Sequence, residues 1–487
     1  MSEDRLSYRF GPLERRGILG PVRVGQAVVL TSGAVLAILV LDLAPSVSGA
    51  FVATVSFAAA VVVAAAPLGS RTLEEWLPVI GSFVLRRRSF RSALPALGIS
   101  GAARAPAPPQ LPRALDGVKI VEAAYRGRQI GVISERGGRR LTTVLACRVV
   151  AFALLDPEAQ ERRLGRWGLV LSGAANTPIR RIQWIERTIP AQGDELARWL
   201  HAERDPTVPL RGTPMIESYL ELIGASAKVT QEHEILVALQ VDARRLRDRG
   251  SDALEQVLLE QIERLAQGLE SAEVAVRGVL SAGQLARALR TAFDPYARAE
   301  LAALQIADPD RDGLPESGAW PLGAQEAWDH YRSDGAVHAT YWIGGWPRVD
   351  VSPMFMEALL GRSSVVRTVA VTFEPLAPQR SIREVESAVT RDHADRALRR
   401  RFGQSETARQ RQAQDSTMRR EAELAAGHTE VRLSGFITVS GRDGDDLRRA
   451  CSEVLEHAAR ARLELHRMYG QQAEAFTFTL PLCRGLR

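Results

Sequence analysis

Two long apolar stretches near the N-terminus, Gly25–Leu41 and Ala50–Leu68, dominate the hydrophobic pattern of the chain. Neither contains a charged residue. Each is about as long as the 17–25 residues that cross a bilayer as a helix. The connector between them, Asp42–Gly49, is too short for a folded domain, so the pattern predicts a transmembrane hairpin. The alternative is a buried hairpin in a soluble protein. A cleaved signal peptide fits poorly, because it has one shorter apolar core.

The distribution of basic residues predicts how the hairpin lies in the membrane. The connector contains Asp42 and neither lysine nor arginine. Arginines lie on both outer sides of the hairpin, at Arg15, Arg16 and Arg23 before it and at Arg71 and Arg86–Arg88 after it. Because basic residues are retained on the cytoplasmic side, we expect a two-pass protein of the cell (inner or plasma) membrane with both termini in the cytoplasm.

The residues after the second stretch predict an amphipathic helix. Thr72 and Glu75 have the spacing of a capping box. Pro78 is expected to kink or restart the helix. An apolar stripe is formed by Leu73, Trp76, Leu77, Ile80, Phe83 and Val84. An interfacial helix places aromatic and basic residues at the membrane surface. The candidate membrane-interface residues are therefore Trp76, Arg86, Arg87 and Arg88. A short amphipathic core helix is the alternative.

A Pro/Ala-rich linker, 92–117, follows, in which five prolines oppose regular helix and sheet. Beyond it, Val- and Ile-rich runs alternate with amphipathic segments, which indicates an α+β fold with split βαβ units. We expect four regions: the hairpin with its juxtamembrane helix (1–91), the linker (92–117), a β-rich domain (118–228) and an α+β domain (229–487).

The expected elements can be placed from hydrophobic periodicity and turn residues. The strands are Val118–Ala124, Gln129–Glu135, Arg140–Phe152, Ile179–Thr188, Glu232–Val241, Val274–Leu280, Val337–Ile343, Val365–Phe373, Val431–Val439 and Ala475–Leu480. The helices are Pro157–Gly173, Asp252–Ala272, Gly283–Phe293, Tyr296–Ala307, Pro353–Leu360 and Asp446–Tyr469. No internal repeat of fixed short period is evident.

A long polar stretch at 381–427 contains no proline and few apolar residues. Gly403 and Ser405 divide it into two segments, which favours a protruding helical hairpin. Within it, Arg391–Arg420 contains nine arginines and four acidic residues. This face could contact nucleic-acid phosphates. It contains one aromatic residue, Phe402, and no recognised nucleic-acid-binding module surrounds it, so a solvated helix face is favoured.

Motif tests argue against an enzyme. The P-loop motif requires a lysine after a glycine, but the only two lysines, Lys119 and Lys228, follow Val118 and Ala227. Neither a nucleophile elbow nor an S-x-x-K or H-E-x-x-H motif occurs. The net charge of +6 is a mild excess and comes almost entirely from arginine. We therefore expect no catalytic activity and no cofactor.

Candidate metal ligands are weak. Cys147, Cys451 and Cys483 are scattered, so neither a disulfide framework nor a zinc site is indicated. The segment Asp308–Gly313 resembles the start of a calcium loop, but the twelfth position is Ala319 where a bidentate glutamate belongs. An acidic surface turn is favoured there. His330 and His338 match no metal template, and structural histidines are expected.

The order of these parts resembles a known secretion apparatus. The two apolar stretches with Gly69–Trp76 resemble the PrgI family of small membrane subunits of conjugative type IV secretion systems. The remaining chain is similar to the N-terminal, non-motor half of conjugation ATPases of the CagE/TrbE/VirB class. The elements that carry this resemblance are Leu289–Pro295, Trp342–Arg348, the long polar helices, Gln472–Phe476 and Leu480–Leu482.

This resemblance implies a structural subunit rather than a motor. In the family a motor domain follows the last of these elements, whereas the chain ends at Arg487. It looks most like an actinobacterial version with a separately encoded motor. We expect a membrane-anchored subunit that docks a separate P-loop ATPase beside other membrane subunits, as a possible homo-oligomer. Trp342, Trp346 and Arg348 are candidate partner contacts, although a core strand ending in a turn also explains them.

Two other hypotheses remain open. A membrane-tethered hydrolase of unrecognised type would use Asp294 or the region of His330 and His338. A membrane-tethered nucleic-acid-binding factor would use the Arg391–Arg420 face, and its binding would depend steeply on salt.

Overall fold

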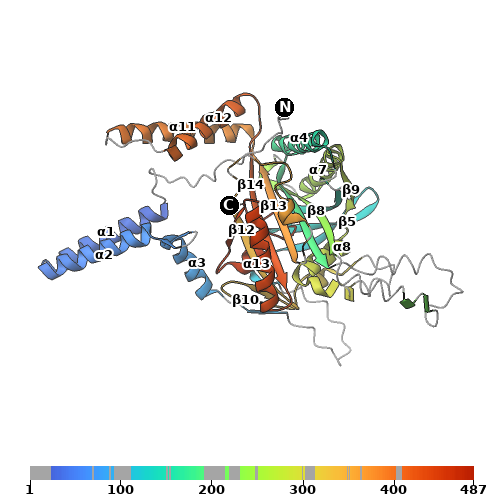
Figure 1. Cartoon of the computed structure of the whole chain (residues 1–487), viewed down its shortest axis with the longest axis horizontal. Coiled ribbons are helices and arrows are strands. Elements are labelled where there is room, and N and C mark those ends of the chain that lie inside the picture. Colours follow the sequence, from blue (N-terminus) through green and yellow to red (C-terminus); the bar gives the residue numbers. More distant parts are fainter. Residues whose placement is uncertain are drawn as a thin grey trace. The chain divides into compact units, whose positions relative to one another are not determined.

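The computed structural model describes residues 24–68, 71–86, 89–92, 111–149, 155–190, 231–246, 251–298, 313–347, 351–361, 365–401 and 408–486, with a few shorter pieces between them. The side chains of 391–415 are not described. The described chain forms two compact units. One contains Ser89–Ser387 and Asp415–Arg487, and the other contains Gly11–Arg88 and Ala388–Gln414. Figure 1 shows the elements of both units.

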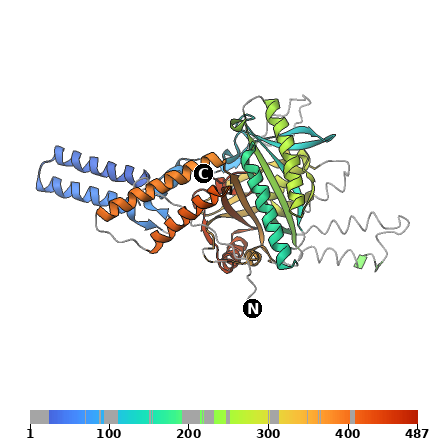
Figure 2. The same ribbon diagram turned by 90° about the horizontal axis from the view of Figure 1, so that it is seen from above.

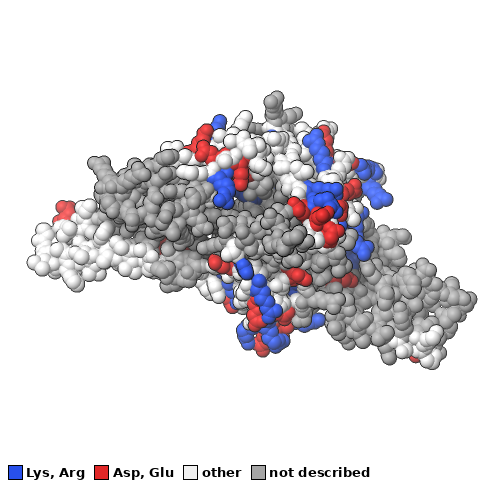
Figure 3. Space-filling view, turned by 45° about the horizontal axis from the view of Figure 1, so that its top comes forward, with Lys and Arg blue, Asp and Glu red and all other residues white. Residues whose placement is uncertain are grey.

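The apolar stretches form two helices, α1 (Val24–Leu43) and α2 (Val47–Ala65), both long and apolar enough to cross a membrane. The second begins three residues earlier than expected and ends at Ala65 rather than Leu68. Ser46 caps it by accepting a hydrogen bond from the Gly49 amide at 3.1 Å. Pro67 and Leu68 instead form the short strand β1, which pairs with β2 (Arg71–Thr72). The white left-hand part of Figure 3 shows how little charge this hairpin carries.

The two helices approach closely at small residues. A Cβ added at Gly33 would lie 2.3 Å from the Ala60 Cβ, so any side chain there would collide. The Gln26 amide donates a hydrogen bond to the Ala64 carbonyl at 2.9 Å. Small residues and interhelical hydrogen bonds are typical of packing between membrane helices.

Helix α3 (Leu73–Leu85) has the expected capping box, in which the Thr72 amide donates to Glu75 Oε2 at 3.2 Å. The helix continues through Pro78 instead of restarting there. Glu74 and Val79 are its buried residues, whereas the apolar stripe is half-buried or exposed. The exposed side of α3 is therefore largely apolar.

The larger unit is built on one 13-stranded sheet in which every described pairing is antiparallel. Its order is β3-β10-β11-β12-β14-β13-β7-β8-β6-β5-β4, with β15 beside β12 and β9 beside β6. The strands are β3 (Ser89–Arg91), β4 (Lys119–Tyr125), β5 (Arg128–Glu135), β6 (Arg140–Val149), β7 (Ile179–Pro190), β8 (Gln231–Asp242), β9 (Val274–Val279), β10 (Gly323–Glu326), β11 (Tyr331–Ser333), β12 (Ala336–Gly345), β13 (Val366–Pro375), β14 (Val431–Gly441) and β15 (Glu464–Arg467).

This sheet does not divide at the expected domain boundary of 228/229. Strand β8, which follows that boundary, pairs with β6 and β7, which precede it. The expected boundary therefore falls within one sheet, because strands on both sides of it pair with one another. Strand β3 (Ser89–Arg91) lies just before the expected linker and already belongs to this sheet, and most of residues 92–117 lie outside the described residues.

The sheet contains two copies of one βαββαβ arrangement, which confirms the split βαβ prediction. Half A (residues 119–293) has β6, α4 (Pro157–Gly173), β7, β8, α7 (Ser251–Ser271) and β9, and its strands lie in the order β9-β6-β8-β7. Half B (residues 323–476) has β12, α10 (Glu357–Leu360), β13, β14, α13 (Gly444–Arg460) and β15, in the order β15-β12-β14-β13. The halves join where β7 pairs with β13.

Each half carries the same additions. A hairpin lies beside the first strand of each, β4–β5 in half A and β10–β11 in half B. A helix follows the last strand of each, α8 (Ala282–Phe293) in half A and α14 (Gln472–Phe476) in half B. Strand β3 then extends half B through β10, whereas β4 ends the sheet on the half A side.

Helices cover both faces of the sheet. Leu258 and Ile262 of α7 pack with Val237 and Leu239 of β8, and α13 packs on the corresponding side of half B. Figure 2 shows α4 and α7 crossing in front of the strands. On the other face, α8 packs with β4 and β5 and α14 packs with β12. Residues 477–486 also lie on that face, across the junction of the two halves.

The polar stretch forms two helices, α11 (Pro378–Arg401) and α12 (Ala408–Ala425), with 402–407 between them outside the described residues. It leaves and returns at neighbouring strand ends, because Pro375 of β13 pairs with Val431 of β14. Ion pairs between Arg432 and Glu384 at 2.6 Å and between Arg420 and Glu430 hold its base. The insertion therefore begins at the strands, as the expected helical hairpin requires.

Two expected elements near the end of the chain are wrong. The helix predicted for Asp446–Tyr469 ends at Arg460, and β15 follows after Arg462 at φ 58°. The strand predicted for Ala475–Leu480 is instead the end of α14 and a series of turns.

Candidate functional site

The expected partner-contact residues lie at the end of β12. The Trp342 ring is half-buried and packs against a small cluster that contains Phe436 and Phe478. Trp346, also half-buried, packs on the opposite face against the core under α13. Between them, Gly344 and Gly345 form a bulge opposite β15. Trp342 and Trp346 therefore do not form one surface, and their role as partner contacts stays a prediction. Arg348 lies outside the described residues.

The glycines in this bulge are required by close neighbours. A Cβ added at Gly344 would lie 2.0 Å from His466 Cδ2, and one added at Gly345 would lie 2.7 Å from Glu464 Oε2. The run from Trp342 to Trp346 is therefore a strand end with a bulge, as the second sequence interpretation allowed.

The membrane-interface candidates fall in the smaller unit. Trp76 is half-buried on α3, and Arg86 is exposed directly after the helix. Arg87 and Arg88 lie outside the described residues, as do Asp308, Asp310 and Asp312 of the calcium-like segment. Among the described residues, no group of three His, Cys, Asp or Glu side chains comes together as a metal site.

The residues considered for hydrolysis have structural partners. His338 is fully buried, and its ring contacts Ser333 Oγ at 2.9 Å, Ser440 Oγ at 2.8 Å and the Phe293 carbonyl at 3.0 Å. Burial lowers the pKa of His338 to about 4, so the ring is neutral at pH 7. Asp294 accepts hydrogen bonds from the Tyr296, Ala297 and Gly335 amides. Both residues join half A to half B.

A buried arginine attaches α8 to the sheet. Arg187 on β7 donates to Glu234 Oε2 at 2.8 Å, to the Ala288 carbonyl at 3.2 Å and to Thr291 Oγ1 at 3.0 Å. Burial lowers the pKa of Arg187, and Glu234 opposes that shift. The three acceptors explain how a charge is tolerated there, because buried ions require paired hydrogen bonds.

The three cysteines are all buried and unpaired with one another. Burial raises the pKa of Cys147 to about 12 and also raises the pKa of Cys451 and Cys483. Thiols of this kind are poor nucleophiles, because the thiolate is the reactive form.

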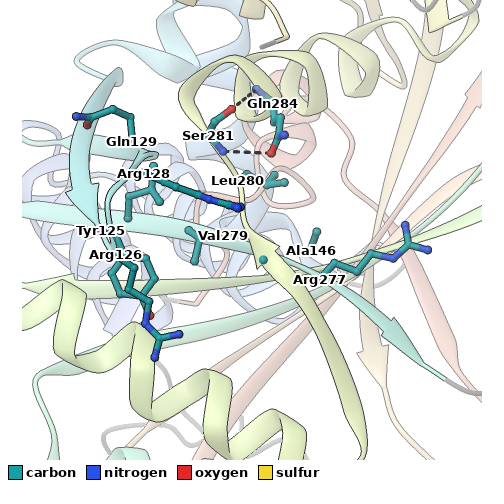
Figure 4. A pocket seen from close by; sticks show the side chains of 12 residues that line it. Tyr125, Arg126, Arg128, Gln129, Ala146, Arg277, Val279, Leu280, Ser281 and Gln284 are labelled. Carbon is teal, nitrogen blue, oxygen red and sulfur yellow. Dashed lines mark hydrogen bonds between the residues drawn. The ribbon is translucent and has the colours of Figure 1, made fainter. Parts of the chain in front are cut away.

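The described surface has an open cleft in half A that sequence reasoning missed. It lies between the turn of the β4–β5 hairpin, the end of β9 and the start of α8, and its volume is about 880 Å³. Figure 4 shows its residues. The side chains that line it include Tyr125, Arg126, Arg128, Gln129, Ile130, Arg277, Val279, Leu280, Ser281 and Gln284.

The cleft is shaped by close backbone packing. The Gly131 amide donates to the Leu280 carbonyl at 2.8 Å, and a Cβ on Gly131 would lie 2.8 Å from the Ser281 carbonyl oxygen. A bulge between Ala146 and Cys147 of β6 leaves Arg277 as the extra residue of β9. The bulge therefore sets the position of an exposed arginine at the rim.

The cleft is positively charged. Of the described residues that line it, three are arginines and none is acidic. Arg126 forms an ion pair with Glu263 of α7, which lies outside the cleft. Arg128 and Arg277 are exposed and have no ion-pair partner within the described part of the chain. Figure 4 shows Arg128 reaching across the cleft toward β9, with Arg277 directed away from it.

One side of the cleft is anchored to α7. The Tyr125 hydroxyl donates to Glu263 Oε2 at 2.7 Å, and burial together with Glu263 raises the pKa of Tyr125. Sequence reasoning did not reveal this cleft, because β5 and β9, which both line it, are far apart in the chain.

Comparison with protein families gives a match to a secretion-system component. Residues 216–343 match the EccE family, described as "Putative type VII ESX secretion system translocon, EccE". This segment covers about a quarter of the chain and extends from just before β8 into β12. No curated protein matches the chain.

The family match and the two apolar helices support a membrane-associated component of a secretion system. The expectation of a secretion-system membrane subunit is thereby supported, whereas its type IV assignment, with the PrgI and CagE/TrbE/VirB resemblance, is not supported by this match.

Proposed function

We propose that this chain is a membrane-anchored structural subunit of a type VII-like secretion translocon. The match to EccE carries the proposal, because it names a translocon and covers the passage from half A into half B. The hairpin α1–α2 would hold the chain in the membrane in two passes, with both termini in the cytoplasm. The double βαββαβ sheet would then contact partner subunits at the inner membrane surface.

The arrangement of α3 and β3 supports this division of roles. The exposed side of α3 includes Leu77, Ile80 and Val84 and suits the membrane interface. Only a few residues separate the end of α3 at Leu85 from Ser89, where β3 joins the edge of the sheet. The chain thus passes from an interfacial helix directly into the soluble fold.

We further propose that one partner is a separate P-loop ATPase, with other membrane subunits as further partners. The chain has no P-loop lysine. In the described structure, Asp294 and His338 form hydrogen bonds with backbone groups and hydroxyls. These features favour a non-enzymatic role. The subunit would position the motor at the membrane rather than hydrolyse ATP.

Affinity purification from detergent-solubilised membranes tests the proposal. The tagged chain is expected to retain type VII membrane subunits and a P-loop ATPase, as identified by mass spectrometry. The pure chain is expected to hydrolyse no ATP. Recovery of type IV conjugation proteins instead would contradict the type VII assignment, and hydrolysis by the pure chain would contradict the structural role.

A further inference from the structure

The two halves can be compared directly at the position of the half A cleft. In half A, the Leu280 amide that follows β9 donates to the Val144 carbonyl of β6 at 2.9 Å. In half B, the Met468 amide that follows β15 donates to the Thr340 carbonyl of β12 at 3.0 Å. The start of α8 beside the β4–β5 hairpin therefore corresponds to the start of α14 beside the β10–β11 hairpin.

In half B this position is closed by the protein's own acidic side chains. Arg467, the last residue of β15, donates to the Asp329 carbonyl at 2.8 Å and lies 3.6 Å from Asp329 Oδ2. Glu326 Oε1 accepts the Ala473 amide at the start of α14 at 2.9 Å. The Trp328 and Tyr469 rings stack over this region with centroids 6.4 Å apart.

In half A the residues around the hairpin turn are basic rather than acidic. The turn offers Arg126, Arg128 and Gln129 where half B offers Glu326 and Asp329. Helix α8 does not require an external cap, because Ser281 and Gln284 bond each other's amides at 3.1 and 3.3 Å. The open feature of half A is thus an arginine cleft without a carboxylate, not a free helix end.

We propose that this cleft binds an acidic peptide segment of a partner subunit. Aspartate or glutamate side chains of that segment would pair with Arg128, which reaches across the cleft, as Asp329 pairs with Arg467 in half B. The apolar side chains of Ile130, Val279 and Leu280 would contact the rest of the segment. Charge-assisted bonds to arginine are strong enough to select carboxylates. The inference deepens the proposed function by naming the chemistry of one partner.

A binding assay on the full chain in detergent micelles tests the inference. The probe is a fluorescein-labelled peptide of twelve glutamates, with a twelve-residue glutamine peptide and inorganic phosphate for comparison. The wild-type chain is expected to bind the glutamate peptide, and Arg128→Glu to weaken binding by about tenfold or more. The glutamine peptide is expected not to bind.

A matched control separates the cleft from general charge. Arg332 is exposed on β11, the half B counterpart of β5, so Arg332→Glu makes the same charge change elsewhere. It is expected to leave peptide affinity within about twofold of wild type. Equal loss in both variants, or no loss in Arg128→Glu, would overturn the inference. Displacement of the peptide by an equal concentration of phosphate would also overturn it, in favour of a phosphate-bearing ligand.

The outcome is independent of the secretion assignment. Peptide binding is measured on the pure chain, whereas the proposed function is tested by the proteins that purify with it. If the chain binds the peptide but no translocon subunits purify with it, the cleft inference stands and the proposed function is wrong. If translocon subunits purify with the chain but the peptide does not bind, the proposed function stands and the cleft inference is wrong.

Discussion

The side-chain oxygen of Gln183 accepts a hydrogen bond from the Cys483 backbone amide at 2.8 Å, although the two residues are 300 positions apart. The Gln183 amide nitrogen also donates to the Phe478 carbonyl at 2.8 Å. Gln183 is fully buried on β7, beside the junction with β13. Gln183 therefore helps to fix residues 477–486 against the centre of the double sheet, together with Gln240 and Thr372.

Replacing this glutamine is expected to loosen that contact. Gln183→Leu would leave one backbone amide and one carbonyl without their partners, at a cost of about 2–4 kcal/mol in the free energy of unfolding. Chemical unfolding followed by tryptophan fluorescence measures this cost. Gln325→Leu, at an exposed strand position, is the control and is expected to change stability by less than about 0.5 kcal/mol. Equal effects would show that the buried bonds contribute little.

Two glycines are expected to respond in opposite directions to alanine. A Cβ at Gly131 would meet backbone atoms of Ser281 and Ala282 at 2.8–2.9 Å, so Gly131→Ala should destabilise the protein by about 1–3 kcal/mol. Gly165 lies within α4 with open space around it, so Gly165→Ala should stabilise it by about 0.5–1 kcal/mol. The same unfolding assay compares them, and a stable Gly131→Ala protein would mean that α8 can move away from β5.

The protein should become less stable as the pH is lowered below about 6.5, because His338 is buried in its neutral form. Its pKa is lowered to about 4 in the folded protein, whereas the unfolded value is 6.5, so the unfolded chain binds the proton first. The contribution of neutral His338 is complete above pH 6.5 and is lost as the pH falls toward 4. The expected loss is a few kcal/mol.

Unfolding midpoints between pH 7.5 and 4.5 measure this dependence. His338→Gln should be less stable at pH 7.5 and should show a shallower decline on acidification. His428→Gln is the control, because His428 is exposed. A wild-type slope that His338→Gln leaves unchanged would assign the acid sensitivity to other groups.

Membrane attachment should depend on the apolar surface of the hairpin. Leu36 on α1 and Val55 on α2 are half exposed in the described protein, at 50% and 51%. Arginine at either position costs about 2.5–3.5 kcal/mol at the centre of a membrane helix. The double variant Leu36→Arg/Val55→Arg should therefore leave the membrane fraction in an alkaline wash.

The control for this experiment lies in the soluble sheet. Val121→Arg places the same charge on β4, where Val121 is 41% exposed, and should leave membrane attachment unchanged. Release of the wild-type chain by the same wash would contradict the membrane-spanning interpretation of α1 and α2.

Local signals account for the elements that could be predicted. Helix α4 begins and ends where expected, because Asp156 caps it, Pro157 suits its first turn and its apolar residues keep a helical period. The helix expected at Asp446–Tyr469 was predicted too long, because Val454, Ala458, Ala461 and Leu465 continue the helical spacing. Leu463 and Leu465 also fit the alternation of a strand. The left-handed turn at Arg462 ends the helix, so these residues form β15 instead.

Long-range topology explains what could not be predicted. The strand expected at Ala475–Leu480 alternates as a strand should, but its carbonyl at Phe478 bonds to a side chain of β7 rather than to a ladder. The duplication was hidden because counterpart helices differ in length, 17 residues in α4 and 4 in α10. The cleft depends on β5 and β9 sharing one side of β6, which no spacing in the sequence reveals.

The antiparallel junction of β7 and β13 sets a fixed spacing. Because Thr188 pairs with Arg367 and Ile182 pairs with Phe373, the chain departs from the two halves at opposite ends of this pair, after Pro190 and after Pro375. At about 3.3 Å per residue, the two departure points are roughly 30 Å apart. A rigid ladder of backbone bonds therefore sets how far apart the chain leaves the sheet at these two points, and a partner that contacts both points must span that distance.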